Sequence, residues 1–307
     1  MRDVCQHILS KIKNAGIKPE PFPHVVISEV FPPGFYPSLL AAIPPADRFV
    51  AACYPGTGFG KGKRPWSGLV YPSLKRLALW GELRAFLKSD LFCRALLDKF
   101  SIPGGIPAEK YKYFAEGARE FSSVFDLQID RRGYEILPHP DVPSKLITFQ
   151  FYLTSDDSLR DFGTLLCRTK GGQPAQRNGS AIKLGNQVQR VAELLQRRPG
   201  VFWQWLERTK LGTEIGLGDS RSWYPWRMFE IVSSIPALPN HFMAFAPNER
   251  SYHAVRMNIP ASSAGRTVLR GFVCSGRHAR NFVKSKQPVE AMKGRAIAGE
   301  KIAAHGS

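Results

Sequence analysis

Apolar residues follow a helical spacing in the first part of the chain. Near the N-terminus they recur at every fourth position, at Val4, Ile8 and Ile12, which places them on one face of a helix. From Pro72 to Phe100 apolar residues return at three- and four-residue intervals, which again predicts helical structure. We therefore expect residues 1–120 to form a helix-rich N-terminal support.

The pattern changes after about residue 121. Short runs rich in β-branched and aromatic residues now dominate, and turn residues separate them: VFDLQI, LITFQFYL, FGTLLCRT, MFEIVSSI, HFMAFA and TVLRGFV. Many short strands at such spacing predict a sandwich or barrel rather than a doubly wound α/β sheet. The expected fold class is mainly β with flanking helices (α+β), with the β-core over residues 121–276.

One segment interrupts the β-rich part. Residues 170–227 contain two helical patterns and a loop rich in Gly and Trp, which we interpret as an insertion attached to the β-core. The tail, residues 277–307, is basic. The organisation predicted for all 307 residues is a single domain with an insertion and a tail.

Composition narrows the setting. The formal net charge is +18 and the pI is about 9.9, which indicates either an anionic partner (a nucleic acid, an acidic glycan, a phosphorylated metabolite or a membrane surface) or solvated Lys and Arg that keep the protein soluble. The five cysteines are scattered without a CxxC pair, which indicates a reducing compartment. No apolar run approaches the roughly 20 residues that a membrane helix needs. We expect a cytoplasmic protein without a membrane span.

Candidate metal ligands stand before one predicted strand, in PHPDVPSKLITFQFYLT. On extended backbone, residues two apart face the same side, so His139 and Asp141 can point an imidazole and a carboxylate at one position. A further histidine must come from elsewhere, and His253 in FAPNERSYHAVRM is the candidate. Two histidines and one carboxylate, with open positions opposite, form the ligand set of non-haem Fe(II) oxygenases. We predict these three residues as metal ligands and as the catalytic centre.

A fixed cation follows on the next predicted strand. Arg266 lies thirteen residues after His253 and opens the run RTVLRGFV. A buried arginine can bind a carboxylate through two parallel hydrogen bonds, which a lysine does less specifically. The chain thus offers a metal site together with a candidate anchor for a dicarboxylate.

Taken in order, these motifs resemble the Fe(II)- and 2-oxoglutarate-dependent oxygenases, specifically their prolyl-hydroxylase-like branch. The matching runs are HPD, then Thr148-Phe-Gln-Phe-Tyr152-Leu153, a glycine-containing strand in DFGTLLCR, AFAPNERSYHAV and RTVLRGF. The lead-in PFPHVVISEVFPPGFYPSLLAAIP is also similar to that of the family. The resemblance covers roughly the middle half of the chain, and it implies a double-stranded β-helix (jelly-roll) core.

The resemblance also implies roles for single residues. His139, Asp141 and His253 correspond to the iron ligands, and Arg266 to the residue that binds the distal carboxylate of 2-oxoglutarate, with the Tyr152 hydroxyl donating to the same group. By strand parity, Thr148 and Gln150 share the face of Tyr152 and are expected to line the co-substrate pocket. Val268 stands where the family often has Ser or Thr, and Arg270, which has the parity of Arg266, is an alternative anchor. The implied cofactors are Fe(II), 2-oxoglutarate and O2.

The function implied is hydroxylation of an unactivated C–H bond in a small-molecule or amino-acid-derived substrate, with release of succinate and CO2. The insertion carries four tryptophans among basic residues, which suits an anionic or aromatic substrate, although a helical hairpin packed on the barrel explains them equally well. A prolyl-type protein hydroxylase is the nearest alternative. A nucleic-acid-directed demethylase is less favoured, because its two arginines stand six apart whereas Arg266 and Arg270 stand four apart. A non-catalytic jelly-roll binding module is the remaining alternative.

Overall fold

The computed structural model describes residues 1–51, 68–101, 120–141, 144–172, 224, 226–276 and 279. The α-helices in these ranges are α1 (Arg2–Asn14), α2 (Phe35–Ala41), α3 (Ala78–Lys88) and α4 (Asp90–Phe100). Short 3-10 helices span Ala46–Arg48, Leu74–Arg76, Asp157–Leu159 and Trp226–Met228. No helix in the described ranges is both long and apolar enough to cross a membrane.

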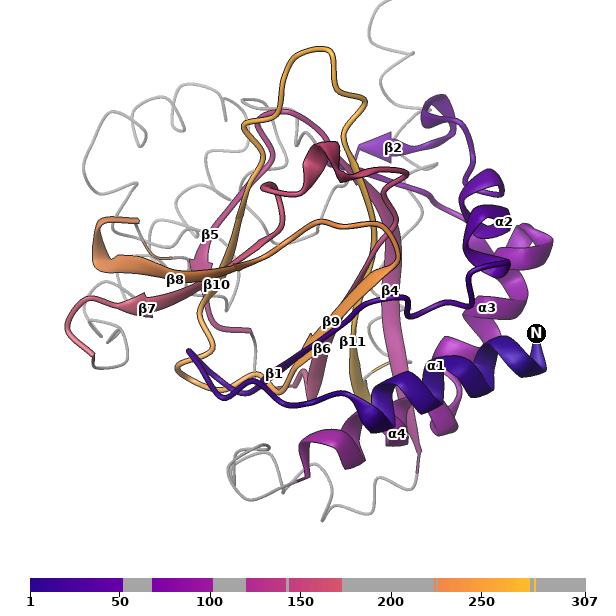
Figure 1. Ribbon diagram of the computed structural model, residues 1–307, viewed down its shortest axis with the longest axis horizontal. Helices are drawn as coiled ribbons and strands as arrows, with labels where there is room; N and C mark the ends of the chain where they lie inside the picture. The colour runs from indigo at the N-terminus through magenta and orange to yellow at the C-terminus, as the bar shows by residue number, and fades with distance from the viewer. Residues whose placement is uncertain are drawn as a thin grey trace, which may run out of the picture.

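Two antiparallel sheets form the centre of the molecule (Figure 1). The larger has the order β1-β9-β6-β11-β4-β3-β2, with β1 His24–Ile27, β9 His241–Phe245, β6 Ile147–Tyr152, β11 Arg266–Ser275, β4 Phe121–Asp130, β3 Gly68–Val70 and β2 Val50–Ala51. The smaller has the order β5-β10-β7-β8, with β5 Glu135–His139, β10 His253–Arg256, β7 Thr164–Thr169 and β8 Phe229–Ile235. Three strands of the larger sheet thus come from the N-terminal region expected to be helix-rich.

The strand order confirms the jelly-roll prediction. From β4 onward the chain crosses between the sheets at every step except from β7 to β8, with β4, β6, β9 and β11 in the larger and β5, β7, β8 and β10 in the smaller. Each sheet therefore interleaves early and late strands, which is the arrangement of a double-stranded β-helix. All six apolar runs singled out in the sequence form strands of this core.

The larger sheet is apolar on one face and mixed on the other. Phe149 and Phe151 of β6 join Leu269 and Val273 of β11 in the main core, which also includes the buried faces of α1, α3 and α4. Figure 1 shows these helices grouped on one side of this sheet. The alternate residues, including Tyr152, point to the opposite side, between the sheets. The even-numbered residues of β6 therefore point their side chains into the interior of the barrel.

The helical segment expected over residues 72–100 is divided in the structure. Ser89 has extended backbone, and its hydroxyl accepts a hydrogen bond from the amide of Phe92 at 3.3 Å. It is therefore the N-cap of α4, while α3 ends one residue before it. The predicted N-terminal helix is confirmed as α1, with Val4, Ile8 and Ile12 buried. The predicted insertion and basic tail lie almost entirely outside the described residues.

Candidate metal centre

The three predicted ligands come together at one end of the smaller sheet. His139 is the last residue of β5, Asp141 follows two residues later, and His253 opens the neighbouring strand β10, directly opposite His139 in the register. Their ligand atoms lie within 4.8 Å of one another. His139 and Asp141 are buried, with 5% and 8% of their surface exposed, and His253 is slightly more open.

Both histidine rings are held by their own strands. Nδ1 of His139 lies 2.9 Å from the carbonyl oxygen of Leu137, and Nδ1 of His253 lies 3.1 Å from that of Ser251. A carbonyl oxygen can only accept, so Nδ1 of each neutral ring carries the proton and donates it. Each Nε2 is then left with a lone pair, which is the tautomer that a metal requires.

Burial keeps both rings neutral. It lowers the pKa of His139 to about 3, and the neighbouring His253 acts in the same direction. Burial also lowers the pKa of His253, against the opposing charge of Asp141. At neutral pH the two imidazoles are therefore available as uncharged ligands.

Asp141 supplies the negative charge of the site. Burial pushes the pKa of its carboxyl group upward, but the positive charge of Lys145, together with the interactions with His253 and His139, outweighs burial, so the pKa lies below its usual range. Oδ1 forms an ion pair with Lys145, and Oδ2 accepts a hydrogen bond from the Thr148 hydroxyl at 2.6 Å. Oδ2 also lies 3.7 Å from Nε2 of His253, so this oxygen faces the imidazoles.

Aromatic side chains enclose one flank of the site. The ring centroids of His139 and His253 are 4.3 Å apart, and the ring of Phe245 meets His253 edge-on at 4.9 Å. Phe22 packs behind Phe245 at 5.2 Å. These contacts exclude water from this side of the histidine pair and limit the rotation of His253.

The residues predicted to bind the co-substrate lie at increasing distances from the candidate metal ligands along β6 and β11. Thr148, beside the metal ligands, is opposite Phe272; Gln150 is opposite Arg270; and Tyr152 is opposite Val268. With a rise of about 3.4 Å per residue, Arg270 is about 7 Å deeper than Phe272 along the strand, whereas Arg266 is about 20 Å deeper.

Arg266 lies in a closed ion pair at the far end of the barrel. It is fully buried, and its Nε and Nη2 donate to Oδ2 of Asp130 at 3.2 and 2.6 Å. Its Nη1 donates to the carbonyl oxygen of Phe162 at 2.5 Å. The Tyr152 hydroxyl is hydrogen-bonded to the Thr164 hydroxyl at 2.7 Å. The structure thus does not bring Arg266 and Tyr152 to the metal ligands.

Arg270 lies between that ion pair and the metal ligands. Its Nη1 donates to the Tyr134 hydroxyl, and its guanidinium stands 5.4 Å from the centre of the Tyr134 ring. Its charge contributes to the electrostatic environment of His253. Beside it, Gln150 is 8% exposed, and the described residues give its Nε2 no hydrogen-bond partner. A buried amide without an acceptor is costly and indicates a place for a ligand oxygen.

Two residues of the site were not singled out from the sequence. Lys145 follows Asp141 by four residues, but this spacing indicates a contact only on a helix, and neither residue lies in one. Tyr134 stands in the turn before β5, and only the register of the sheets brings it to Arg270. The parity of Thr148 and Gln150, in contrast, was readable from the alternation of β6.

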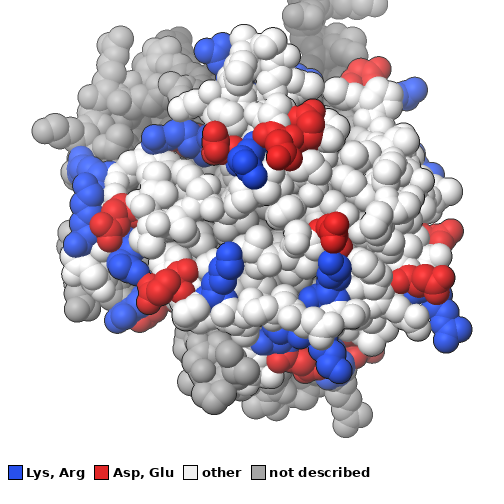
Figure 2. All heavy atoms as spheres, viewed as in Figure 1, with Lys and Arg blue, Asp and Glu red and all other residues white. Residues whose placement is uncertain are grey.

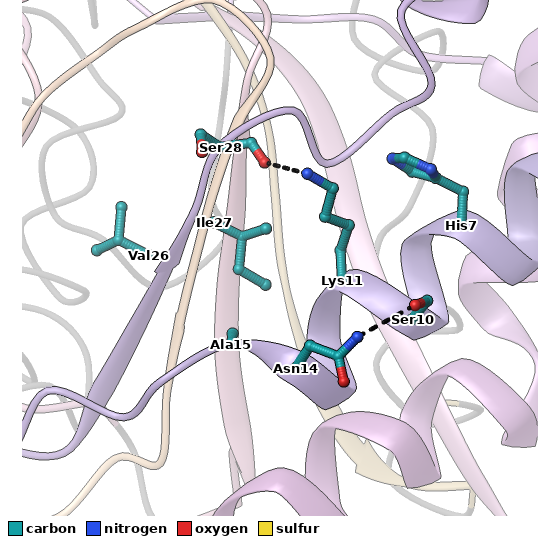
Figure 3. A pocket seen from close by; sticks show the side chains of 8 residues that line it. All are labelled: His7, Ser10, Lys11, Asn14, Ala15, Val26, Ile27 and Ser28. Atoms are coloured by element: carbon teal, nitrogen blue, oxygen red, sulfur yellow. Dashed lines mark hydrogen bonds between the residues drawn. The ribbon is translucent and has the colours of Figure 1, made fainter.

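A separate cavity of about 430 Å³ lies outside the barrel, between α1 and β1 (Figure 3). Lys11 points across it to the carbonyl oxygen of Ser28 at 3.3 Å and forms an ion pair with Glu29 at 3.6 Å. His7 Nε2 lies 3.0 Å from the carbonyl oxygen of Glu29. These groups fasten α1 to the chain after β1, so we interpret the cavity as structural.

The charge surplus is small on the described part of the chain. The described residues contain 22 Lys and Arg against 17 Asp and Glu, a net charge of +5 out of the total of +18. Figure 2 shows acidic and basic side chains interspersed on the face that it presents. Most of the positive charge therefore belongs to residues outside the described ranges.

Comparison with known proteins gives limited similarity. No family model matches the chain, and no curated protein matches it. Among solved structures, the epimerase SnoN in complex with Fe3+, alpha ketoglutarate and nogalamycin RO is 11% identical, with 90% of this chain and 85% of that chain covered and a TM-score of 0.39. AviO1 from Streptomyces viridochromogenes Tue57 is 12% identical, with 88% and 95% covered and a TM-score of 0.35. At this similarity a function cannot be transferred, and the chemistry must be argued from the residues of this chain.

Proposed function

We propose that the protein is an Fe(II)- and 2-oxoglutarate-dependent oxygenase that hydroxylates a C–H bond of a small-molecule or amino-acid-derived substrate. The observation that carries this proposal is the convergence of two neutral imidazoles and one carboxylate within 4.8 Å. This donor set suits Fe(II) and leaves further coordination positions for other ligands. His139, Asp141 and His253 would hold the iron.

When bound, Fe(II) together with 2-oxoglutarate and O2 supplies the oxidation of the C–H bond. The atoms balance because 2-oxoglutarate leaves as succinate and CO2, taking up one oxygen atom, while the substrate gains the other. The protein's own contribution is to fix the three ligands and to keep water away from one flank through Phe245 and Phe22. Thr148 and Lys145 hold the carboxylate in place.

For the distal carboxylate of 2-oxoglutarate we favour Arg270 over Arg266. The end carbons of this five-carbon acid are about 5 Å apart, from four C–C bonds of about 1.5 Å each. Arg270 stands about 7 Å along the strand from the level of Thr148, within reach of such a molecule, and Arg266 stands about 20 Å away. The donors of Arg266 are also directed to Asp130 and to the carbonyl of Phe162.

Two neighbours of Arg270 complete this anchor. The Nε2 of Gln150 is a buried donor that needs an acceptor, and Gln150 lies directly opposite Arg270 in the register. The Tyr134 hydroxyl already contacts the Arg270 guanidinium. A carboxylate received here would accept charge-assisted hydrogen bonds in a site largely withdrawn from water. Tyr152, hydrogen-bonded to Thr164, would support the wall of the pocket rather than bind the carboxylate.

The described part of the chain does not by itself favour a nucleic acid as the substrate. The described part of the chain carries a net charge of only +5, and its charges are interspersed on the face seen in Figure 2. Nucleic-acid binding depends on several phosphate contacts made by clustered Lys and Arg. Hydroxylation of a protein side chain is the nearest alternative, and the products formed with candidate substrates distinguish the two.

The experiment is an anaerobic titration of the protein with Fe(II) and 2-oxoglutarate, following the visible charge-transfer band of the chelate. The wild type should develop the band, and His139→Ala should not. In Arg270→Met, the 2-oxoglutarate concentration for half of the band should rise about 10- to 150-fold, the equivalent of a lost charge-assisted hydrogen bond.

The matched control is Arg256→Met. Arg256 is half-exposed and forms an ion pair with Glu135 at 2.9 Å, so its loss should leave the band unchanged. A folded wild type without any band would contradict the proposed function. A band that forms normally in Arg270→Met would contradict only the choice of anchor.

A further inference from the structure

Gln128 on β4 carries a buried polar atom that the proposed anchor does not use. The side chain is fully buried, and its Nε2 donates to Oδ1 of Asp130 at 2.5 Å. A carboxylate can only accept a hydrogen bond, so this contact fixes which end of the amide is the nitrogen. The described residues give the other end, Oε1, no donor. A buried acceptor without a donor is costly, so the donor that this oxygen needs is expected from a ligand or a water molecule.

Gln128 lies beside the proposed anchor, one step further from the metal ligands. In the register it stands opposite Val268, which is two residues, or about 7 Å, beyond Arg270 along β11. A methyl group at Gly68 would come within 2.7 Å of Nε2 of Gln128 and 3.0 Å of Cε2 of Tyr134. The hydroxyl group of this tyrosine accepts a hydrogen bond from Arg270. Gln128, Tyr134 and Arg270 are therefore successive neighbours inside the barrel.

Two buried amides of opposite character thus lie near Arg270. Gln150, directly opposite Arg270, has an unpartnered donor, and Gln128, one step deeper, has an unpartnered acceptor. Because Nε2 of Gln128 is directed to Asp130 at the far end of the barrel, its Oε1 is turned away from that aspartate. A carboxylate can accept hydrogen bonds from Arg270 and Gln150, but it has no proton to donate to Gln128. The wall therefore changes from donors to an acceptor between the two glutamines.

Resting on the proposed function, we propose that Gln128 limits the length of the 2-oxo acid that the site accepts. A five-carbon diacid ends at Arg270 and Gln150, whereas each added methylene group carries the distal carboxylate about 1.3 Å further toward Gln128. There two acceptor oxygens would face each other in the interior without a proton between them, which is unfavourable. With 2-oxoglutarate bound, a water molecule can donate to Oε1 and satisfy it. Gln128 is in this sense a specificity-determining residue.

The test compares 2-oxoglutarate with 2-oxoadipate, which is longer by one methylene group, in anaerobic titrations of the Fe(II)-loaded protein. The charge-transfer band reports the affinity for each acid without turnover. Gln128→Met retains the length of the side chain and removes the acceptor, and Gln128→Lys removes the acceptor but retains a donor for Asp130. The wild type should bind 2-oxoadipate about 5- to 150-fold more weakly than 2-oxoglutarate, the equivalent of one buried polar group left unsatisfied.

In both variants the ratio of the two affinities should fall toward one, because 2-oxoadipate binds on the order of tenfold more tightly once the acceptor is gone. Gln128→Lys should show the larger gain, since its ammonium group also attracts the longer carboxylate. The matched control is Thr154→Val. Oγ1 of Thr154 is likewise buried without a partner among the described residues, but Thr154 stands four residues after Gln150, beyond the end of β6, so its loss should leave the ratio unchanged. Thermal unfolding of each variant checks that the protein is folded.

The remaining outcomes separate this inference from the proposed function. A wild type that binds both acids equally well would overturn the length limit alone. An unchanged ratio in the Gln128 variants would do the same, since the discrimination would then come from the distance between the metal ligands and Arg270. A folded wild type that shows no band with either acid would overturn the proposed function and this inference with it.

Discussion

Two buried pairs of a cation with an aspartate lie inside the same barrel, one at each end. At the far end, Arg266 directs its donors to Asp130 and to a backbone carbonyl, and both side chains are fully buried. At the metal end, Lys145 engages one oxygen of Asp141, whose other oxygen faces His253. A buried ion pair therefore does not identify a binding site by itself. A binding site also needs polar groups near the pair that can contact a ligand.

The two ion pairs also differ in whether they leave groups available for a ligand. The Arg266–Asp130 pair stabilises the barrel only as a complete unit, since removing either partner strands a charge in the interior. The Lys145–Asp141 pair lies beside two unprotonated nitrogens and can serve a third, incoming charge. Three measurements test the difference between the two ends of the barrel.

The largest effect is expected at the closed pair. Arg266→Met should lower the free energy of unfolding by about 3–5 kcal/mol, because Asp130 is left charged in the interior. Urea unfolding measures the change. The double variant Arg266→Met/Asp130→Asn should recover much of it, since Asn retains an acceptor for Gln128, which donates to Asp130 at 2.5 Å. Unchanged stability in the single variant would contradict a structural role for this pair.

An intermediate effect on stability is expected when the pH is lowered, because His139 is buried as a neutral imidazole. The pKa of His139 is lowered to about 3 in the folded protein and lies near 6.5 in the unfolded chain. Below about pH 6.5 the unfolded chain therefore binds a proton that the folded protein does not. In the presence of a chelator, this residue should lower the free energy of unfolding by up to about 1.4 kcal/mol per pH unit. His139→Gln should show a shallower dependence between pH 6.5 and 5; equal slopes would contradict the buried neutral imidazole.

The smallest effect is expected at Gln150. The variant Gln150→Leu lacks the unpartnered Nε2 and should bind 2-oxoglutarate about 2- to 10-fold more weakly, as for one neutral hydrogen bond. Removing a buried unsatisfied group should leave stability unchanged or slightly higher. Isothermal titration calorimetry and urea unfolding check the two expectations. If the variant loses stability without any change in affinity, Gln150 belongs to the structure of the wall and not to the anchor.

The sequence predicted a larger part of the fold than of the candidate site. Runs rich in β-branched and aromatic residues identified six strands of the core, but not β5 (EILPH), which contains a proline, or β10 (HAVR), which has only four residues. These two strands carry the histidines. His139 and His253 were found through their chemistry, because HPD and a later histidine suggest metal ligands whatever the local structure.

The choice between Arg266 and Arg270 shows where sequence reasoning stops. The two arginines have the same parity, so both can point into the barrel, and only the pairing of β11 with β6 fixes their depth. Lys145 was missed because neither it nor Asp141 lies in a helix, and outside a helix a spacing of four residues does not indicate a contact. The pairs that form across strands or turns are the part of the site that requires three dimensions.

β11 is the strand on which both arginines stand, and neighbouring strands hold it on both sides. It pairs with β4 over all ten residues and with β6 along its centre. At Gly271 even a methyl group would come within 2.4 Å of Cβ of Phe125 and of the carbonyl oxygen of Val124. Substitutions can therefore hardly shift this strand, so the positions of both arginines along it are fixed relative to Thr148 on β6. For the proposed oxygenase, new substrates would have to be acquired through the segments that join the strands, while the residues proposed to bind the co-substrate stay in place.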